Sequence, residues 1–306
     1  MKKFIIFILL VLGSKIFAQK TVAFTIDDVP NTGLFKNAGY HSRLMEIVDS
    51  LHLPVAIFIN EERLYYTDSV TKNFELLNEW IKNPLVTMGN HTFSHPKYSD
   101  VGIETFKTEI LKGEAISAEL AKKYHKKVEY FRSPYNDLGK NAEEHRQLEH
   151  YLKSLHYIST PFTVHSEDWL FTQLYEYYIS RNQYKDAKRI GNQYVTKTLG
   201  YFDYIESLTD KKLNRNVKHI YLMHDNLLNA DYLEALVSAL KQRDYNFITL
   251  KSAMTDPIYA QKDHYQEKAG ISWVYRWIED KQERIKLQRR EPNMEELENE
   301  LTEIKK

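Results

Sequence analysis

The feature that most constrains the fold of this sequence is an alternation of short β-rich runs with longer helical patterns. The helical patterns carry apolar residues on one face, as Leu44, Ile47, Val48 and Leu51 do within residues 40–52. Strands that alternate with helices predict βαβ units and a parallel sheet. The expected strands are, in chain order, residues 21–26, 54–59, 85–88, 128–131, 157–164, 217–223 and 246–250.

Seven parallel strands over about 230 residues predict a distorted α/β fold, a (β/α) barrel or an incomplete one. Two regions stand outside the alternation. Residues 170–216 are aromatic-rich and longer than one crossover helix, so they predict a helical insertion. Residues 256–306 predict a charged C-terminal helical extension, because 16 of the last 28 residues are charged. This extension is expected to be a solvated helix that packs through residues 273–278. The expected barrel domain is therefore residues 19–255.

The first 18 residues predict a secretory signal peptide. Two lysines precede the apolar run of residues 4–12, and Ala18 follows as a small residue before the expected cleavage point. The run is too short for an ordinary membrane-spanning helix, which needs about 20 apolar residues. A secreted or periplasmic protein is expected, and an uncleaved N-terminal membrane anchor is the alternative. The absence of cysteine means that stability comes from the core rather than from disulfides.

Polar clusters follow five of the expected strands. In a parallel barrel the carboxyl ends of the strands share one face, and active sites are built on that face. The clusters therefore predict one site. They are Asp27 and Asp28, His91 and His95, the segment from Arg132, the pair Asp168 and Trp169, and His224.

The histidine pair predicts a metal site within this group. On a helical turn, residues four apart lie on one face, so His91 and His95 would reach one ion. Residue 92 is threonine, which excludes the H-E-x-x-H arrangement of metalloproteases. A catalytic zinc needs a third protein ligand, which a carboxylate of the Asp27–Asp28 pair supplies. The other carboxylate would remain free as a base. Surface or core histidines are the plainer alternative for such a pair.

The order of the motifs "TIDDVP", "HTFSH", "RSPYND", "SEDW" and "LMHD" resembles the polysaccharide deacetylases, carbohydrate esterase family 4. This resemblance covers about residues 20–255 and implies a distorted (β/α) barrel, the nodulation-protein homology domain. It implies a metal-dependent hydrolase that acts on carbon–nitrogen bonds other than peptide bonds. The implied metal ligands are Asp28, His91 and His95, and the implied ion is one divalent metal, usually zinc.

The resemblance also assigns the remaining roles. Asp27 would be the general base that activates the attacking water, and His224 the general acid that protonates the leaving group. Arg132 would orient Asp27, and Asp168 would orient His224. The backbone N–H of Tyr135 would stabilise the oxyanion. Trp169 and Leu222 would wall the substrate pocket.

Three positions depart from the family pattern. Ile26 and Val29 stand where the family usually has phenylalanine and glycine around the double aspartate, and Asn136 replaces a common glycine. Val29 is expected to crowd the floor of the site. His165 lies three residues before Asp168 and is expected to be structural, and Asp225 is expected to cap a helix.

The predicted function is removal of acetyl groups from N-acetylated sugars or glycans by an exported enzyme. Three alternatives stay open: an esterase that removes O-acetyl groups from xylan-type glycans, a carbohydrate-binding protein without turnover, and a hydrolase of non-sugar amides. Lys and Arg balance Asp and Glu at 42 each, so a nucleic-acid partner is not expected. The expected partner is an acetylated carbohydrate. The sequence leaves the oligomeric state, the glycan and the loaded metal open.

Overall fold

A computed structural model describes residues 19–306. The predicted signal peptide, residues 1–18, lies outside the described residues. All seven expected strands are present. They are β1 (Lys20–Val29), β2 (Val55–Ile59), β3 (Val86–Asn90), β4 (Val128–Phe131), β5 (Ile158–Ser159), β6 (Lys218–His224) and β7 (Tyr245–Phe247).

The strands form one curled parallel sheet, which confirms the predicted α/β barrel-type fold. Its order is β5-β4-β3-β2-β1-β6. β6 pairs with one edge of β1, so β7 and β2 share the other edge. β7 pairs with residues 20–22 of β1, and β2 pairs with its later part. The seventh strand is therefore not inserted between β6 and β1, which is one distortion from a regular barrel.

The segment after β5 brings the two ends of the sheet together. Val164 forms a single parallel bridge with Tyr221 of β6. The backbone N–H of Thr163 and of Val164 both donate to the carbonyl of Ile220, and Leu222 donates back to Val164. The sequence predicts one strand over 157–164, whereas the structure keeps only its two ends paired, with β4 and with β6 respectively.

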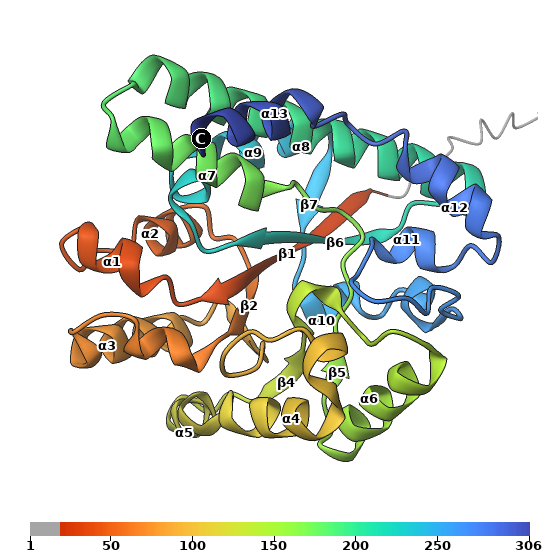
Figure 1. Ribbon diagram of the computed structural model, residues 1–306, viewed down its shortest axis with the longest axis horizontal. Coiled ribbons are helices and arrows are strands. Elements are labelled where there is room, and N and C mark those ends of the chain that lie inside the picture. The colour runs from red at the N-terminus through yellow and green to blue at the C-terminus, as the bar shows by residue number, and fades with distance from the viewer. Residues whose placement is uncertain (1–18) are drawn as a thin grey trace, which may run out of the picture.

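Helices surround the sheet on several sides (Figure 1). α1 to α3 follow β1 and β2, α4 to α6 lie beside β4 and β5, and α7 to α9 lie beyond β1 and β6 (Figure 1). Up to α10, the helices are α1 (Thr32–Asn37), α2 (Arg43–Ser50), η1 (Glu61–Tyr65), α3 (Val70–Lys82), α4 (Tyr98–Lys112), α5 (Ala115–Lys123), η2 (Pro134–Asn136), α6 (Ala142–Ser154), α7 (Asp168–Ser180), α8 (Tyr184–Leu213), α9 (Leu227–Lys241) and α10 (Leu250–Ala253).

α9 shows how the sequence forms these helices. Asn226 precedes it, and its side-chain oxygen accepts from the backbone N–H of Asn229 at 2.8 Å, which caps the first turn. Leu233, Leu236, Val237 and Leu240 then recur at helical spacing and are buried in the core. α9 packs mainly against α2, α7 and α8, and it also contacts β7.

The predicted helical insertion is confirmed as the antiparallel pair α7 and α8. α8 is 30 residues long, and its buried side chains include Tyr194, Phe202 and Ile205. Their packing makes the aromatic residues of the insertion part of the main core.

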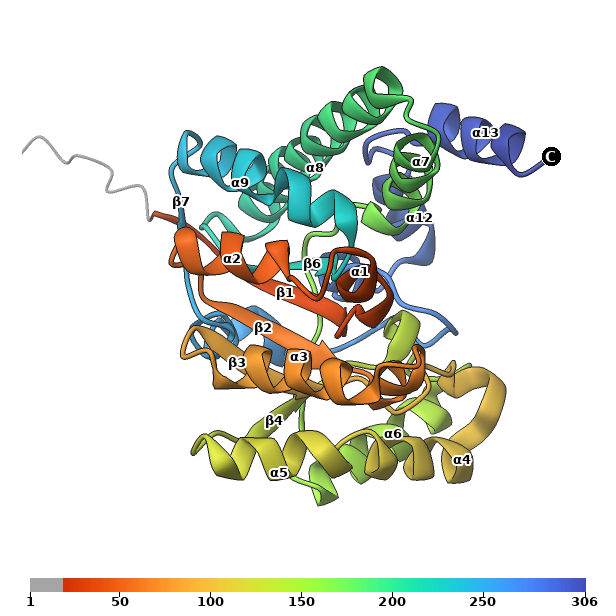
Figure 2. The ribbon, with the colours of Figure 1, turned by 90° about the vertical axis from the view of Figure 1, so that its left-hand side faces the viewer.

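The predicted helical tail is also confirmed, but it is broken into short pieces instead of one solvated helix. Val274 and Tyr275 of the expected packing segment are buried, and so are Leu297 and Leu301 near the end of the chain. α13 lies against α7 (Figure 2). The pieces are η3 (Pro257–Ala260), α11 (Trp273–Arg276), α12 (Lys281–Gln288) and α13 (Glu295–Ile304). Across residues 19–306, no helix combines the length and apolarity needed to cross a membrane.

Candidate metal and catalytic site

The carboxyl ends of the strands bring the predicted site residues together. Asp27 of β1 is the register partner of His224, the last residue of β6. His91 follows β3, Arg132 follows β4, and Asp168 begins α7. Because the strands are parallel, all of these side chains lie at one edge of the sheet.

Asp28, His91 and His95 form a group that could hold a metal ion. One ligand atom from each lies within 4.8 Å of the others. Oδ1 of Asp28 lies 3.9 Å from Nε2 of His91 and 3.5 Å from Nε2 of His95. The two imidazole rings lie 4.9 Å apart between centroids. These are the three residues that the sequence predicts as ligands.

The histidine pair is not on a helix, which corrects the expectation from its spacing. Residues 91–97 form a loop after β3, with Thr92 and His95 in left-handed conformations (φ 67° and 60°). Thr92 hydroxyl oxygen accepts from the backbone N–H of His95 at 3.2 Å, and the side-chain amide of Asn60 donates to the Thr92 carbonyl at 3.2 Å. The loop, and not a helical turn, therefore turns both rings toward Asp28.

Asp28 is set apart from its neighbour by its backbone. Its φ is 65°, so Asp27 and Asp28 leave the strand in different directions. Oδ2 of Asp28 binds the guanidinium of Arg63 at 2.7 Å. Oδ1 is buried and has no hydrogen-bond partner among the described residues. A buried carboxylate oxygen without a donor is costly, and a cation at this position would satisfy it.

His91 is oriented by the loop after β4. Its Nδ1 donates to the carbonyl of Arg132 at 2.6 Å. This bond fixes the tautomer and leaves the lone pair of Nε2 facing Asp28. A carbonyl partner of this kind is typical of histidines that bind metals.

The pKa shifts agree with a ligand set that is ready for a cation. Burial lowers the pKa of His91, and burial together with the nearby His91 lowers the pKa of His95 to about 4. Burial alone would raise the pKa of Asp28, but Arg63 and the histidines outweigh it and lower that pKa to about 2. At neutral pH the group is thus one carboxylate and two neutral imidazoles, the protonation state that metal binding requires. The residues present fit a divalent ion.

Asp27 forms a second, separate arrangement with Arg132. Oδ1 of Asp27 accepts from Nη1 of Arg132 at 2.7 Å, and the arginine side chain is fully buried. The same Nη1 donates to the hydroxyl of Thr25 at 2.8 Å, and the guanidinium lies over the ring of Phe58 at 4.3 Å. Oδ2 of Asp27 faces the ligand group, 3.7 Å from Nε2 of His91. The two adjacent aspartates therefore have different partners.

His224 and Asp168 form a third arrangement. Nδ1 of His224 lies 2.7 Å from Oδ1 of Asp168, and the backbone N–H of His224 donates to Oδ2 at 2.7 Å. Burial by itself would lower the pKa of His224, but Asp168, with smaller contributions from Asp28 and Asp27, raises it to about 10. His224 is therefore protonated at neutral pH, as a general acid requires.

The other predicted residues lie around these three arrangements. The ring of Tyr135 lies 4.7 Å from that of His95, and its backbone is left-handed, with φ 57°. Trp169 is half exposed, with 51% of its surface accessible. Leu222 lies two residues before His224 on β6, so its side chain leaves the strand on the same face. Val29, the neighbour of Asp28, is fully buried in the core.

Sequence reasoning missed several residues that contact the site. Arg63 binds Asp28 from η1, and no motif marks it. Asn226 and Asn229 donate to Oδ2 of Asp168 at 3.1 and 2.7 Å. Asn226 is also the residue that caps α9, so the expected cap at Asp225 is wrong; Asp225 instead accepts from the backbone of Asn31 at 2.7 Å. Only the fold reveals these contacts.

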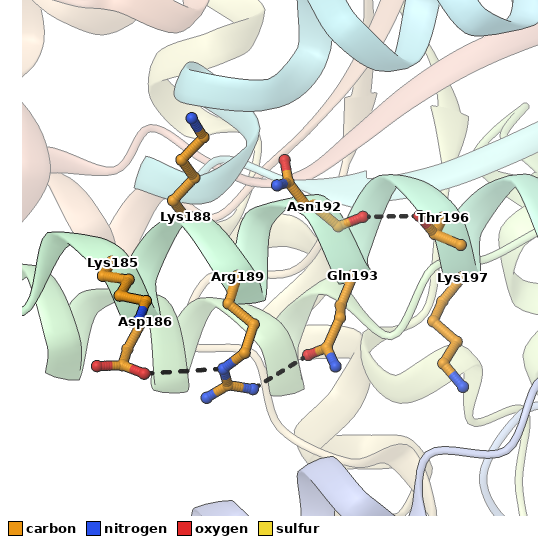
Figure 3. Close-up of a pocket in the computed structure, with 8 residues that line it drawn as sticks. All are labelled: Lys185, Asp186, Lys188, Arg189, Asn192, Gln193, Thr196 and Lys197. Carbon is orange, nitrogen blue, oxygen red and sulfur yellow. Dashed lines mark hydrogen bonds and ion pairs between the residues drawn. The ribbon is translucent and has the colours of Figure 1, made fainter.

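A surface hollow of about 540 Å³ lies away from this site (Figure 3). It runs along one face of α8, where Arg189 pairs with Asp186 and contacts Gln193 (Figure 3). None of the predicted site residues lines it. The candidate site is therefore the group at the strand ends.

Comparison with known families agrees with this geometry. The family model described as polysaccharide deacetylase matches residues 14–152. Residues 14–152 belong to the polysaccharide deacetylase family. The resemblance predicted from the motifs is thus confirmed. The matched region includes Asp27, Asp28, the histidine pair and Arg132, and it ends before Asp168 and His224.

Solved structures show the same fold. A mutant of a CE4 family pseudoenzyme from Bacillus anthracis, with restored enzymatic activity, is 16% identical (TM-score 0.51) and aligns over 77% of this chain and 68% of its own. A peptidoglycan N-acetylglucosamine deacetylase is 16% identical (TM-score 0.51; 78% and 89% coverage). A polysaccharide deacetylase from Bacillus cereus is 16% identical (TM-score 0.50; 76% and 92%). A search of curated protein sequences finds no match. At these identities the structural likeness establishes the fold of this chain and not its substrate.

Proposed function

We propose that this protein is a metal-dependent hydrolase that removes acetyl groups from N-acetylated sugars or glycans. The observation that carries the proposal is the division of the site into three arrangements: a ligand group, a carboxylate with its arginine, and a histidine with its aspartate. Hydrolysis of an amide needs all three functions, because the amine leaves only when it is protonated. The family match supports the reaction class.

The ligand group would be Asp28, His91 and His95. Two imidazoles and one carboxylate suit zinc, which keeps an open position in catalytic sites of this kind. A divalent ion held there would supply Lewis acidity to the acetyl carbonyl and to the attacking water. Oδ1 of Asp28, which has no hydrogen-bond partner within residues 19–306, supports this assignment.

Asp27 would be the general base. Its Oδ1 is held by Arg132, while its Oδ2 faces the ligand group and is the oxygen that can take a proton from the attacking water. Arg132 balances the charge of this carboxylate and fixes its rotamer, since the guanidinium is itself fixed by Thr25 and Phe58. A base held in one orientation needs no rearrangement during the reaction.

His224 would be the general acid. Nδ1 is engaged with Asp168, so Nε2 is the nitrogen left to donate a proton to the departing amine. Asp168 also accepts from Asn226 and Asn229, which hold the carboxylate in place. The pKa of about 10 keeps the acid protonated before the reaction begins.

Tyr135 and the pocket walls complete the proposed site. The backbone N–H of Tyr135 would bind the oxyanion of the tetrahedral intermediate. Trp169 offers a half-exposed aromatic face of the kind on which sugar rings stack, and Leu222 would line the acetyl pocket. The predicted signal peptide supports an exported location, where extracellular glycans are available.

The pairing of Asp27 with Arg132 and of Asp168 with His224 favours turnover over simple carbohydrate binding, because binding alone requires neither pair. An acetate-release screen tests the proposal. The purified protein is incubated with N-acetylglucosamine oligomers, peptidoglycan and acetylated xylan, with and without a chelator. Release from the N-acetylated substrates that the chelator abolishes is the expected result. Release only from xylan would identify an O-acetyl esterase, and no release from any of them would contradict the proposal.

A further inference from the structure

The C-terminal extension contacts two of the loops that carry the site. The backbone N–H of Gly270 donates to the carbonyl of Tyr135 at 2.9 Å. A Cβ atom at residue 270 would lie 2.1 Å from Cβ of Asn136, so only glycine permits this approach. On the other loop, Trp273 donates to the carbonyl of Phe162, and Ser272 to that of Thr163. The extension therefore contacts both the loop of Tyr135 and the loop that leads to Asp168.

An ionic contact between the extension and the site loop lies at His165. Nδ1 of His165 lies 2.9 Å from Oε1 of Glu167 in the loop, and Nε2 lies 3.6 Å from Oε1 of Glu291 in the extension. The same Glu291 oxygen accepts from the hydroxyl of Tyr275 at 2.6 Å. The imidazole also contacts the ring of Tyr201 on α8, at 4.5 Å between centroids. One imidazole thus joins two carboxylates from distant parts of the chain.

Glu167 carries this connection to the substrate side of the site. Its Oε2 accepts from the indole N–H of Trp169, the residue proposed to face the glycan. Glu167 has a left-handed backbone, with φ 52°, and it directly precedes Asp168, the partner of His224. The carboxylate of Glu167 therefore binds Trp169, and these two residues flank Asp168 in the chain.

The charges explain why a histidine occupies this position. Glu167 and Glu291 are mostly covered, with 25% and 16% of their side-chain surface exposed, and they would repel each other without a cation between them. Burial by itself lowers the pKa of His165, but the two glutamates raise it to about 10, so the imidazole is cationic at neutral pH. His165 is consequently structural, as expected, but it has a defined position between two acids.

We infer that His165, with Glu167 and Glu291, is a positioning residue that ties the C-terminal extension to Trp169 and thereby sets the wall of the glycan-binding side of the site. The inference rests on the proposed function in so far as Trp169 contacts sugar. It assigns the extension a part in substrate affinity. It does not assign it a part in metal binding or in proton transfer.

Glu291→Ala tests the inference, with Glu300→Ala as a matched control. Glu300 also lies in the extension, but it binds Tyr178 on α7 and Arg189 on α8, away from the site loop. Both variants weaken the packing of the extension, and only Glu291→Ala breaks the connection to Trp169. Two readouts are measured: iodide quenching of Trp169, taken as the difference from the same protein with Trp169→Phe, and the kinetics on an N-acetylglucosamine tetramer.

Glu291→Ala is expected to increase the quenching of Trp169 and to raise KM for the tetramer about three- to tenfold, the effect of losing one charge-assisted contact. kcat and metal content should stay at wild-type values. Glu291→Gln should keep both readouts closer to the wild-type values, because its amide oxygen can still accept from the hydroxyl of Tyr275. Wild-type quenching and KM in Glu291→Ala, or equal changes in Glu300→Ala, would overturn the inference.

Two further arms keep the test decisive. If Glu291→Ala does not fold, Tyr275→Phe removes only one partner of Glu291 and should shift both readouts in the same direction by a smaller amount. No shift in that variant would overturn the inference. If the wild-type protein neither binds nor hydrolyses the tetramer, the proposed function fails, while the quenching of Trp169 still decides whether the connection exists.

Discussion

Nη2 of Arg63 lies 2.7 Å from Oδ2 of Asp28, so one oxygen of the proposed metal ligand already binds a cation. Only Oδ1, which has no hydrogen-bond partner among the residues described, remains for an ion. The arginine thus restricts Asp28 to ligation through a single oxygen. It also acts on the protonation of its neighbours, because it lowers the pKa of both Asp28 and His95.

Arg63→Gln should therefore make metal binding more sensitive to acid. Without the arginine, the pKa of Asp28 and that of His95 both rise, so protons compete with the ion at higher pH. The midpoint of acid-induced metal release should move upward by about one pH unit. Metal content after equilibration across a pH series measures it, with Arg63→Lys as the control that keeps the charge. An unchanged midpoint in Arg63→Gln would contradict this role.

The two adjacent aspartates should respond differently to the same substitution. Asp27→Asn should retain metal while hydrolysis falls by about 10²–10⁴, the usual contribution of a general base. Asp28→Asn should weaken metal binding, and added zinc should restore part of the activity. Zinc content and acetate release are measured on both variants. Loss of metal from Asp27→Asn would mean that both carboxylates are ligands.

Asp168→Asn should shift the alkaline limb of the activity profile. The folded-state pKa of His224 is raised to about 10, so the acid form and its stabilising pairing persist below that pH and are lost above it. Without the carboxylate, burial dominates and lowers the pKa. The alkaline limb of kcat should then move down by about two pH units or more. Glu206→Gln is the control, since Glu206 pairs with His219 at 3.0 Å, near the start of β6. A limb that stays in place in Asp168→Asn would exclude His224 as the acid.

Removing the charge of Arg132 should destabilise the whole protein. The guanidinium is fully buried, and Arg132→Leu would leave the buried carboxylate of Asp27 without a partner. The free energy of unfolding should fall by about 3–5 kcal/mol. Arg189→Leu is the matched control, because its pair with Glu300 is partly exposed, and it should cost about 1 kcal/mol or less. Urea unfolding of both variants measures the difference. Equal losses would contradict the prediction, because the buried pair of Arg132 and Asp27 would then contribute no more to stability than the partly exposed pair of Arg189 and Glu300.

Cleavage of the signal peptide should leave the barrel complete. β1 begins at Lys20, so a cut after Ala18 spares the pairing of Lys20 with Tyr245 of β7. Mass spectrometry of exported material should find a chain that begins at Gln19. Full-length chain that only detergent extracts would favour the membrane anchor instead.

The strands and the site residues were predictable from the sequence because both depend on local patterns. Apolar β-rich runs mark the strands, and chemistry-bearing residues follow them at the edge where parallel strands end. The conformation of the histidine pair was not predictable in this way. A spacing of four fits a helical turn, whereas the loop of Thr92 and His95 reaches the same juxtaposition through left-handed residues and contacts from Asn60.

The contacts of Arg63 and Glu291 depend on the fold and not on a pattern. Arg63 lies in a short helix after β2, and it meets Asp28 only because β1 and β2 are neighbours. Glu291 lies in a strongly charged stretch, where most glutamates are exposed. Nothing in its surroundings in the sequence distinguishes it from Glu295 or Glu296, which are exposed at the start of α13.

The pairing of β1 also decides when during synthesis this protein can fold. β1 pairs with β6 and β7, which are synthesised some two hundred residues later. The segment after β5 accepts hydrogen bonds from Ser272 and Trp273, which are synthesised about one hundred residues after it. Contacts of such long range cannot form on a partly made chain. The nascent polypeptide therefore remains without its complete barrel until nearly all of it has left the ribosome, and an unfolded chain is the form that the predicted signal peptide would require for export.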